Sequence, residues 1–209
     1  IPSSACGIVG LKPTHGRVSK YGCFPLGWSL DHIGPMTKTV KDAAAMLEVI
    51  AGYDYRDPTC IDKPVESYLQ QITGDVKDLV IGIEEDYFFN NVDKDVEQAV
   101  RQQIQYLVDQ GAKVETIKLP SLQNIEWAML ITIISEASAI HHKNLQLRPQ
   151  DFGDDVRFLL ELGELPSAVD FLHAQQIRQQ IKQDFNNILS KVDVIISPTL
   201  PIVPNKIGN

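Results

Sequence analysis

Hydrophobic and polar positions in the middle of the chain follow periods that predict a strand, a helix and a second strand. The apolar run at 79–83 is typical of a short strand. Between Asp93 and Gly111, apolar residues recur every three or four positions, which is the spacing of an amphipathic helix. Residues 112–119 then alternate as a second strand. A strand, helix and strand within about 40 residues form a βαβ unit with parallel strands, so the predicted fold class is α/β.

The segments on either side of this unit are predicted to be mainly helical. Thr39 is a suitable N-cap for a helix that ends at Gly52, and further helices are expected over 122–147, 151–162 and 167–190. The run 192–197 is continuously apolar, which is typical of a strand buried within a parallel sheet. Its exit at 197–201 lies where α/β proteins place ligands.

Residues 1–37 have a different character, because six glycines and four prolines interrupt them. Such spacing predicts short strands and tight loops rather than a long helix. Two of these stretches, 7–11 and 23–30, are nevertheless apolar. Solvated loops are usually polar, so these loops are expected to pack on a core or to line a site.

Composition and charge narrow the class of partner. The 209 residues include 19 Lys and Arg against 27 Asp and Glu, a net charge of −8 that does not favour nucleic acid. Apolar residues make up 44% and charged residues 22%, which is a globular balance. No apolar run reaches the roughly 18 residues of a membrane-spanning helix. Neither nucleic acid nor a membrane is therefore expected as partner.

The three cysteines, Cys6, Cys23 and Cys60, match no zinc or redox spacing. Cys6 lies in an apolar run and is expected to be a small buried side chain, with a catalytic thiol as the alternative. Unpaired thiols favour a reducing compartment, so the predicted localisation is cytoplasmic.

Other residues with chemical potential have simpler interpretations. The acidic run 84–86 could bind a metal, but such runs are more often solvated ends of loops, and the pair 154–155 suits the first turn of a helix. His141 and His142 point about 100° apart on a helix and cannot easily share one ion. The segment 7–13 lacks the spacing of a phosphate loop. No metal and no cofactor are predicted.

The sequence of the first 57 residues resembles a known and specific sequence signature. Residues 1–19, IPSSACGIVGLKPTHGRVS, closely resemble the downstream half of the amidase signature. The segment SLDHIGPMT at 29–37, the helix that contains Asp42 and the AGYD at 51–54 continue the match, and 135–138, 152–157 and 197–201 resemble later landmarks in the same order. The chain is thus similar to the amidase signature family.

The resemblance implies a fold and a reaction. The fold is a mixed, largely parallel sheet covered by helices on both faces. Residues 1–209 are expected to be a single incomplete domain, the middle to C-terminal portion of an amidase signature domain. In it, 1–60 are the downstream half of the signature region, and 61–209 hold the βαβ unit, a helical cover over the substrate pocket and a core strand.

Family enzymes hydrolyse carboxylic amides to a carboxylate and ammonia or an amine through a Ser–Ser–Lys triad, in which Lys moves protons through a bridging Ser to the nucleophilic Ser. The nucleophile would stand only a few residues before Ile1, and the chain starts without Met. No catalytic residue is therefore expected in this chain, which is predicted to be an inactive fragment when alone. Ser3 and Ser4 are not candidates for the triad.

The resemblance also places a loop beside the substrate pocket, with Gly27, Trp28, Ser29 and Asp31 as the candidate substrate-binding residues. Trp28 either sets the shape of the acyl pocket or is a core residue under the loop. Asp31 is expected to hold the loop by accepting backbone hydrogen bonds.

Three functions remain in competition. The first is an amidase that acts on a small amide, for which a homo-oligomer is allowed. The second is the A subunit of a glutamyl-tRNA(Gln)/aspartyl-tRNA(Asn) amidotransferase, which works with partner subunits. That protein carries an additional Arg after the Val-Arg pair, whereas Arg157 is followed by the apolar residues 158–160, which favours the plain amidase. The third is a non-catalytic binding module.

Overall fold

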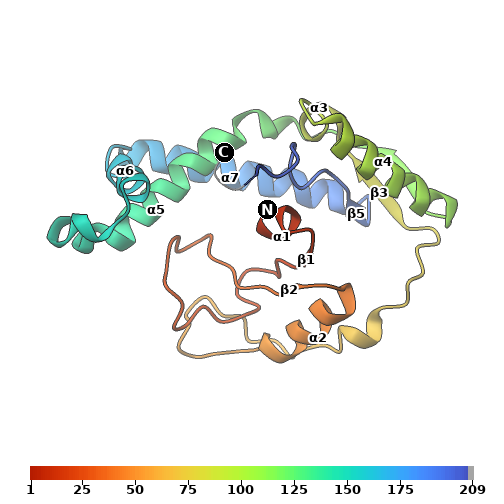
Figure 1. Ribbon diagram of the computed structural model, residues 1–209, viewed down its shortest axis with the longest axis horizontal. Coiled ribbons are helices and arrows are strands. Elements are labelled where there is room, and N and C mark those ends of the chain that lie inside the picture. The colour runs from red at the N-terminus through yellow and green to blue at the C-terminus, as the bar shows by residue number, and fades with distance from the viewer. Residues whose placement is uncertain (207–209) are drawn as a thin grey trace.

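A three-stranded parallel sheet lies at one end of the molecule, on the right in Figure 1. The computed structural model describes residues 1–206. In the sheet, β3 (Val80–Ile83) is central, with β4 (Lys113–Thr116) and β5 (Val194–Ile195) parallel on either side. The helix α4 (Lys94–Asp109) joins β3 to β4. The predicted βαβ unit and the α/β class are therefore confirmed.

Successive side chains of β3 point to opposite faces, and each face is covered by helices. Ile81 and Ile83 belong to a cluster with Ile104 of α4, and Ile81 is completely buried. Val80 packs on the other face against a cluster joined by Phe185 and Ile188 of α7. Gly82 leaves room on that second face, because a Cβ there would lie 3.1 Å from the side chains of both Ile117 and Val192. The two-sided helical cover is thus observed.

A layer of long helices extends away from the sheet along the top of Figure 1. After the 3-10 turn η2 (Pro120–Asn124) come α5 (Ile125–Leu147), the turn η3 (Pro149–Asp151), α6 (Asp154–Leu162) and α7 (Ala168–Leu189). Helices α5 and α7 lie side by side, and α6 packs on α5. Ser167 and Asp170 form a capping box that begins α7.

Residues 1–72 form the lower part of Figure 1. The short helix α1 (Pro2–Ala5) leads to β1 (Val9–Gly10), which pairs antiparallel with β2 (Met36–Thr37). Helix α2 (Val40–Ile50) begins as predicted, with the Thr39 side chain accepting a hydrogen bond of 3.1 Å from the Asp42 backbone N–H. The turn η1 (Leu69–Gln71) follows, and α3 (Glu85–Phe88) comes directly after β3.

Two predictions about burial are wrong. The last strand is not fully buried: β5 covers only two residues, and Val194 is 37% exposed at an edge of the sheet, where β5 pairs with no described strand other than β3. Cys6 is exposed rather than buried, since it is the C-cap of α1 at the surface.

Two acidic residues have other roles than expected. The run 84–86 does not end a loop but starts α3, where the buried Glu84 accepts a 2.8 Å hydrogen bond from the backbone N–H of Tyr87. Asp93 stands at the predicted start of α4, yet its side chain makes no cap there. Its carboxylate accepts instead from the backbone N–H of Val203, which ties the last described residues to α4.

Within residues 1–206, no helix has both the length and the apolar character needed to cross a membrane.

Candidate functional site

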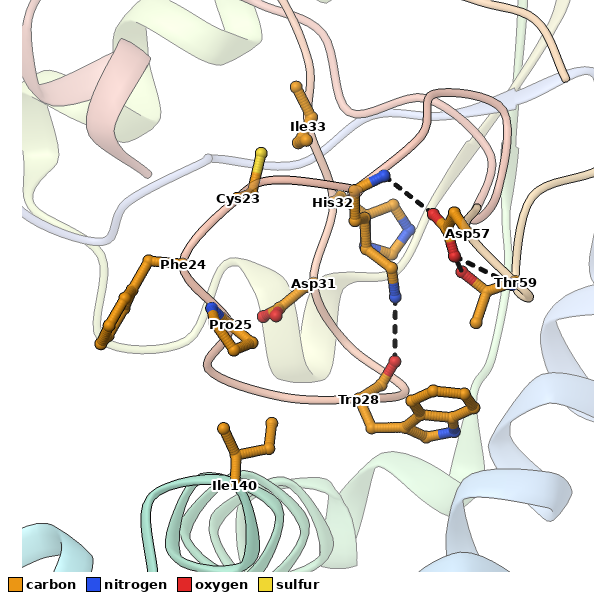
Figure 2. Close-up of a pocket in the computed structure, with 11 residues that line it drawn as sticks. Cys23, Phe24, Pro25, Trp28, Asp31, His32, Ile33, Asp57, Thr59 and Ile140 are labelled. Atoms are coloured by element: carbon orange, nitrogen blue, oxygen red, sulfur yellow. Dashed lines mark hydrogen bonds between the residues drawn. The ribbon is translucent and has the colours of Figure 1, made fainter. Parts of the chain in front are cut away.

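The loop at 23–33 encloses one wall of a cavity of about 340 Å³, shown in Figure 2. The remaining wall comes from Lys20, from α5 through Ile140, and from the segment after α2 through Asp57 and Thr59. Figure 2 shows the loop carrying Trp28, Asp31 and His32 around this space. The predicted site residues therefore lie on a loop that borders a cavity.

Asp31 holds this loop closed upon itself. Its Oδ2 accepts a hydrogen bond of 2.9 Å from the backbone N–H of Leu26, and its Oδ1 accepts one of 2.9 Å from that of Gly27. The Asp31 N–H donates in turn to the Gly27 carbonyl at 2.9 Å. The predicted loop-holding hydrogen bonds of Asp31 are thus observed.

Trp28 is not a core residue, because 61% of its surface is exposed. Its backbone carbonyl accepts a 3.0 Å hydrogen bond from Lys20 Nζ, and the same ammonium lies 5.9 Å from the centre of the indole ring. The interpretation as a core Trp is therefore wrong. Trp28 is instead one of the residues that line the cavity.

Ser29 connects the loop to the helical layer. Its backbone N–H donates to Glu136 Oε2 at 2.8 Å, and its hydroxyl donates to Glu136 Oε1 at 2.5 Å. Arg178 of α7 donates from Nη1 to the same hydroxyl at 2.9 Å. Gly27 is buried beside this contact, where a Cβ would lie 3.3 Å from Glu136 Oε2. Ser29 thus joins two helices that are distant in sequence.

Basic side chains gather at the cavity, which Lys20 and His32 help to line. Lys20 Nζ lies 3.4 Å from His15 Nε2, Lys12 Nζ lies 3.2 Å from His32 Nε2, and the two imidazole rings meet edge to face at 5.0 Å. Burial, and after it the ammonium of Lys20, lower the pKa of His15 below its ordinary value. His15 therefore stays neutral to a lower pH than a solvated histidine.

Asp57 brings a carboxylate to the same cavity. The residue is 7% exposed, and its carboxylate accepts from the Lys20 N–H and from the N–H and hydroxyl of Thr59. Burial alone would raise the pKa of Asp57, but these hydrogen bonds outweigh burial and lower it. The cavity lining therefore includes a carboxylate that stays ionised to a lower pH than a solvated one.

A second cavity, of about 720 Å³, lies on the other side of the loop, around α1. Asp31 and His32 line both cavities, so they separate the two. Thr199 also lines the second cavity. The exit of the last strand therefore reaches a cavity, and its role in binding a ligand stays a prediction.

The four predicted residues lie in one turn of chain, and the structure adds Lys20, Glu136 and Arg178, to which the sequence assigned no individual role. One signal was available for Glu136, because a carboxylate within the apolar stretch of a buried helix requires a partner. No comparable signal marked Arg178, since the distance between α7 and the loop depends on tertiary packing.

Among residues 1–206, no group of three or more His, Cys, Asp or Glu side chains could hold a metal ion. His141 is buried and hydrogen-bonds the Pro25 carbonyl at 2.8 Å, whereas His142 contacts Glu164 on the surface. The structural and surface interpretation of this pair is confirmed. Asp154 and Asp155 stand in the first turn of α6, as expected.

Comparison with known proteins gives one consistent result. The model of the family described as "Amidase" matches residues 1–209. An "Amidase" of Pseudomonas putida is 44% identical over 209 residues, which are 100% of this chain and 45% of that protein. The A subunit of the glutamyl-tRNA(Gln) amidotransferase of Pediococcus pentosaceus is 40% identical over 231 residues, covering 99% of this chain and 48% of that one.

Solved structures agree with the sequence relatives. The A subunit of the glutamyl-tRNA(Gln) amidotransferase of Thermotoga maritima superposes with a TM-score of 0.82 at 32% identity, over 100% of this chain and 46% of the other. A structure described as "Crystal structure of amidase" superposes with a TM-score of 0.84 at 29% identity, over 100% and 44%. The chain spans about half the length of the curated relatives it matches.

Proposed function

Because the chain belongs to the amidase family, we propose that it is part of an amidase that hydrolyses a small carboxylic amide to a carboxylate and ammonia or an amine. One observation carries this proposal. The family matches the chain over all of residues 1–209, and a relative named as an amidase is 44% identical over the same length.

The catalytic groups of this reaction are a Ser–Ser–Lys triad, which we place in the part of the protein that precedes Ile1. The Lys takes a proton from the nucleophilic Ser through the bridging Ser, and backbone N–H groups stabilise the oxyanion of the tetrahedral intermediate. Residues 1–209 contribute binding rather than covalent chemistry. Alone, the chain is expected to be inactive.

The substrate-binding part of the proposal rests on the loop at 27–31. The Trp28 indole borders the cavity and is largely exposed, so it can pack against the acyl part of an amide. Gly27, Ser29 and Asp31 set the backbone that carries the indole, through the hydrogen bonds to Glu136 and within the loop. Helix α5 then covers the pocket through Ile140, and α7 supports the loop through Arg178.

The A subunit of an amidotransferase is the second candidate, favoured by the 40% identity to the Pediococcus pentosaceus protein. The surroundings of Arg157 favour the amidase. Its guanidinium contacts Asp154 at 2.8 Å and lies 3.7 Å from Glu161, both on its own helix. With its charge matched by two neighbours, and Phe158 beside it 63% exposed, the position offers little to a substrate carboxylate.

The experiment uses the full-length protein that contains this chain, and ammonia release is measured with acetamide, benzamide and glutamine. We expect release from at least one simple amide without any other protein, and none from the isolated 209-residue chain. Release from glutamine alone, and only with partner subunits, would favour the amidotransferase. Failure with all three amides would favour a non-catalytic binding module, and turnover by the isolated chain would refute the placement of the triad.

We further propose that the enzyme works in the cytoplasm, because Cys6, Cys23 and Cys60 all have free thiols. Under this proposal the full-length protein keeps its stability in reducing buffer. The amidase proposal also allows the full-length protein to be a homo-oligomer.

A further inference from the structure

A buried carboxylate in the middle of α5 holds the loop that carries Trp28. Glu136 is 9% exposed and accepts two hydrogen bonds from one residue, Ser29, which stands 107 positions earlier. Each oxygen of the carboxylate takes one of them. A two-point contact of this kind fixes the direction of the backbone as well as its distance from the helix.

A second helix completes the contact. Arg178 of α7 donates to the Ser29 hydroxyl at 2.9 Å and to Gln175 Oε1 at 2.7 Å. Gln175 in turn donates a hydrogen bond of 3.1 Å from Nε2 to Oγ1 of Thr132 in α5, and Thr132 is completely buried. The Ser29 hydroxyl therefore lies between the charges of Glu136 and Arg178, in a network that joins the loop to both helices.

The free-energy cost of burying the Glu136 carboxylate indicates that its hydrogen bonds do more than close the loop. Asp31 already closes the loop through bonds to Leu26 and Gly27. Burial of a carboxylate carries a large free-energy penalty unless its hydrogen bonds are complete, so an additional buried Glu136 is a poor way to add stability alone. What it adds is the orientation of the loop relative to α5 and α7.

Helix α5 holds the loop at two points, Ser29 and Pro25. His141 of α5 hydrogen-bonds the Pro25 carbonyl at 2.8 Å, five positions beyond Glu136. Between these two attachments lie Leu26, Gly27 and Trp28. Of the two attachment points, Ser29 is adjacent to Trp28. A change at Glu136 is therefore transmitted directly to the backbone that carries the indole.

We propose that Glu136 and Arg178 are positioning residues, which touch no substrate. Glu136 holds the backbone N–H and the hydroxyl of Ser29 and Arg178 holds the same hydroxyl, so that the Trp28 indole keeps one orientation in the wall of the acyl pocket. This inference rests on the proposed function, because it takes Trp28 as a contact of the acyl group. Losing either side chain should lower kcat/KM more for amides with a bulky acyl group, which contacts the indole, than for amides with a small one, which does not reach it.

The test compares benzamide with acetamide in the full-length protein that contains this chain. In Glu136→Gln, kcat/KM for benzamide should fall by about tenfold relative to that for acetamide, mainly through KM, because a pocket mismatch of one small group is worth about that much. The ratio of the two substrates does not depend on how much of the variant is folded. Arg178→Met should lower the ratio, and Arg178→Lys should restore part of it.

Two further variants separate positioning from general damage. Glu126→Gln removes an exposed carboxylate from the same helix and should leave the ratio unchanged. In a Trp28→Ala background, Glu136→Gln should lower the ratio no further, because the side chain through which it acts is gone. An unchanged ratio in Glu136→Gln, or an equal fall in the Trp28→Ala background, would overturn the inference.

A measurement without turnover keeps the two proposals distinguishable. With 5-fluorotryptophan incorporated, the 19F signal of Trp28, assigned by its loss in Trp28→Phe, should move or broaden in Glu136→Gln but not in Glu126→Gln. An unmoved signal refutes the positioning role even if the protein cleaves amides. Failure of the unmodified protein to cleave either amide, with a signal that does move, refutes the proposed function and leaves the positioning of Trp28 supported.

Discussion

Asp31 is the residue on which the shape of the candidate site most directly depends. Replacing it with Ala removes two charge-assisted hydrogen bonds and leaves the N–H groups of Leu26 and Gly27 without their acceptor. We expect the free energy of unfolding of the full-length protein to fall by about 1–3 kcal/mol. Urea denaturation measures this, with Asp62→Ala, at an exposed carboxylate, as the control. Equal values for the two variants would contradict the role of Asp31.

His15 predicts a dependence of stability on pH. Burial and Lys20 depress its pKa in the folded state below the ordinary value of 6.5. As pH falls below that value, the unfolded chain takes up a proton at this position while the folded protein does not, so stability is lost. Well above pH 6.5, His15 is neutral in both the folded and the unfolded state. It then contributes nothing to the change of stability with pH.

The measurement is the urea midpoint between pH 7.5 and pH 5. The unmodified protein should lose more stability over this range than His15→Asn. A slope that His15→Asn leaves unaltered would mean that His15 is protonated equally in both states.

At the scale of elements, the close approach of α6 to α5 depends on one glycine. Gly163 ends α6 against α5, and a Cβ at this position would lie 2.1 Å from the Ile134 carbonyl oxygen and 2.8 Å from the Ser138 Cβ. Backbone and Cβ atoms cannot move aside as the end of a flexible side chain can. Gly163→Ala should therefore separate α6 from α5.

The expected loss is about 1–3 kcal/mol of unfolding free energy, as for other overpacked sites. Leu165→Ala, two residues further on and 76% exposed in the native protein, should change stability by less than about 0.5 kcal/mol. Circular dichroism during urea denaturation compares the two. A Gly163→Ala variant as stable as Leu165→Ala would show that the two helices can separate without cost.

The elements themselves were largely predictable, because their signals are local. The periods in 93–111 and 167–190 match α4 and α7, and Thr39 and Gly52 bound α2 as expected. The errors occur where a neighbour decides the outcome. The length of β5 depends on its pairing with β3, and the Asp93 carboxylate binds Val203 rather than its own helix. Neither partner is visible in a sequence window.

At the scale of the whole molecule, many large apolar side chains of the 209-residue chain face solvent, including Phe24 and Val49 at 83% and Tyr55 at 81% exposed. Exposed apolar surface of this kind favours association. We expect the isolated chain to self-associate as its concentration rises, and to bind a hydrophobic dye more strongly than the full-length protein does. Analytical ultracentrifugation and dye fluorescence test this, and a monomer that binds no dye would contradict it.

The sequence by itself determined the α/β class, the order of the helices, the family and the segment that forms the candidate site, because periodicity, caps and motif wording are properties of neighbouring residues. Only the tertiary structure decided that Trp28 is exposed at a cavity, that His15 and His32 meet, and that Glu136 and Arg178 converge on Ser29. The physical reason is that these contacts join positions 17 to 149 residues apart, and a hydrogen bond leaves no periodic trace in the chain that forms it.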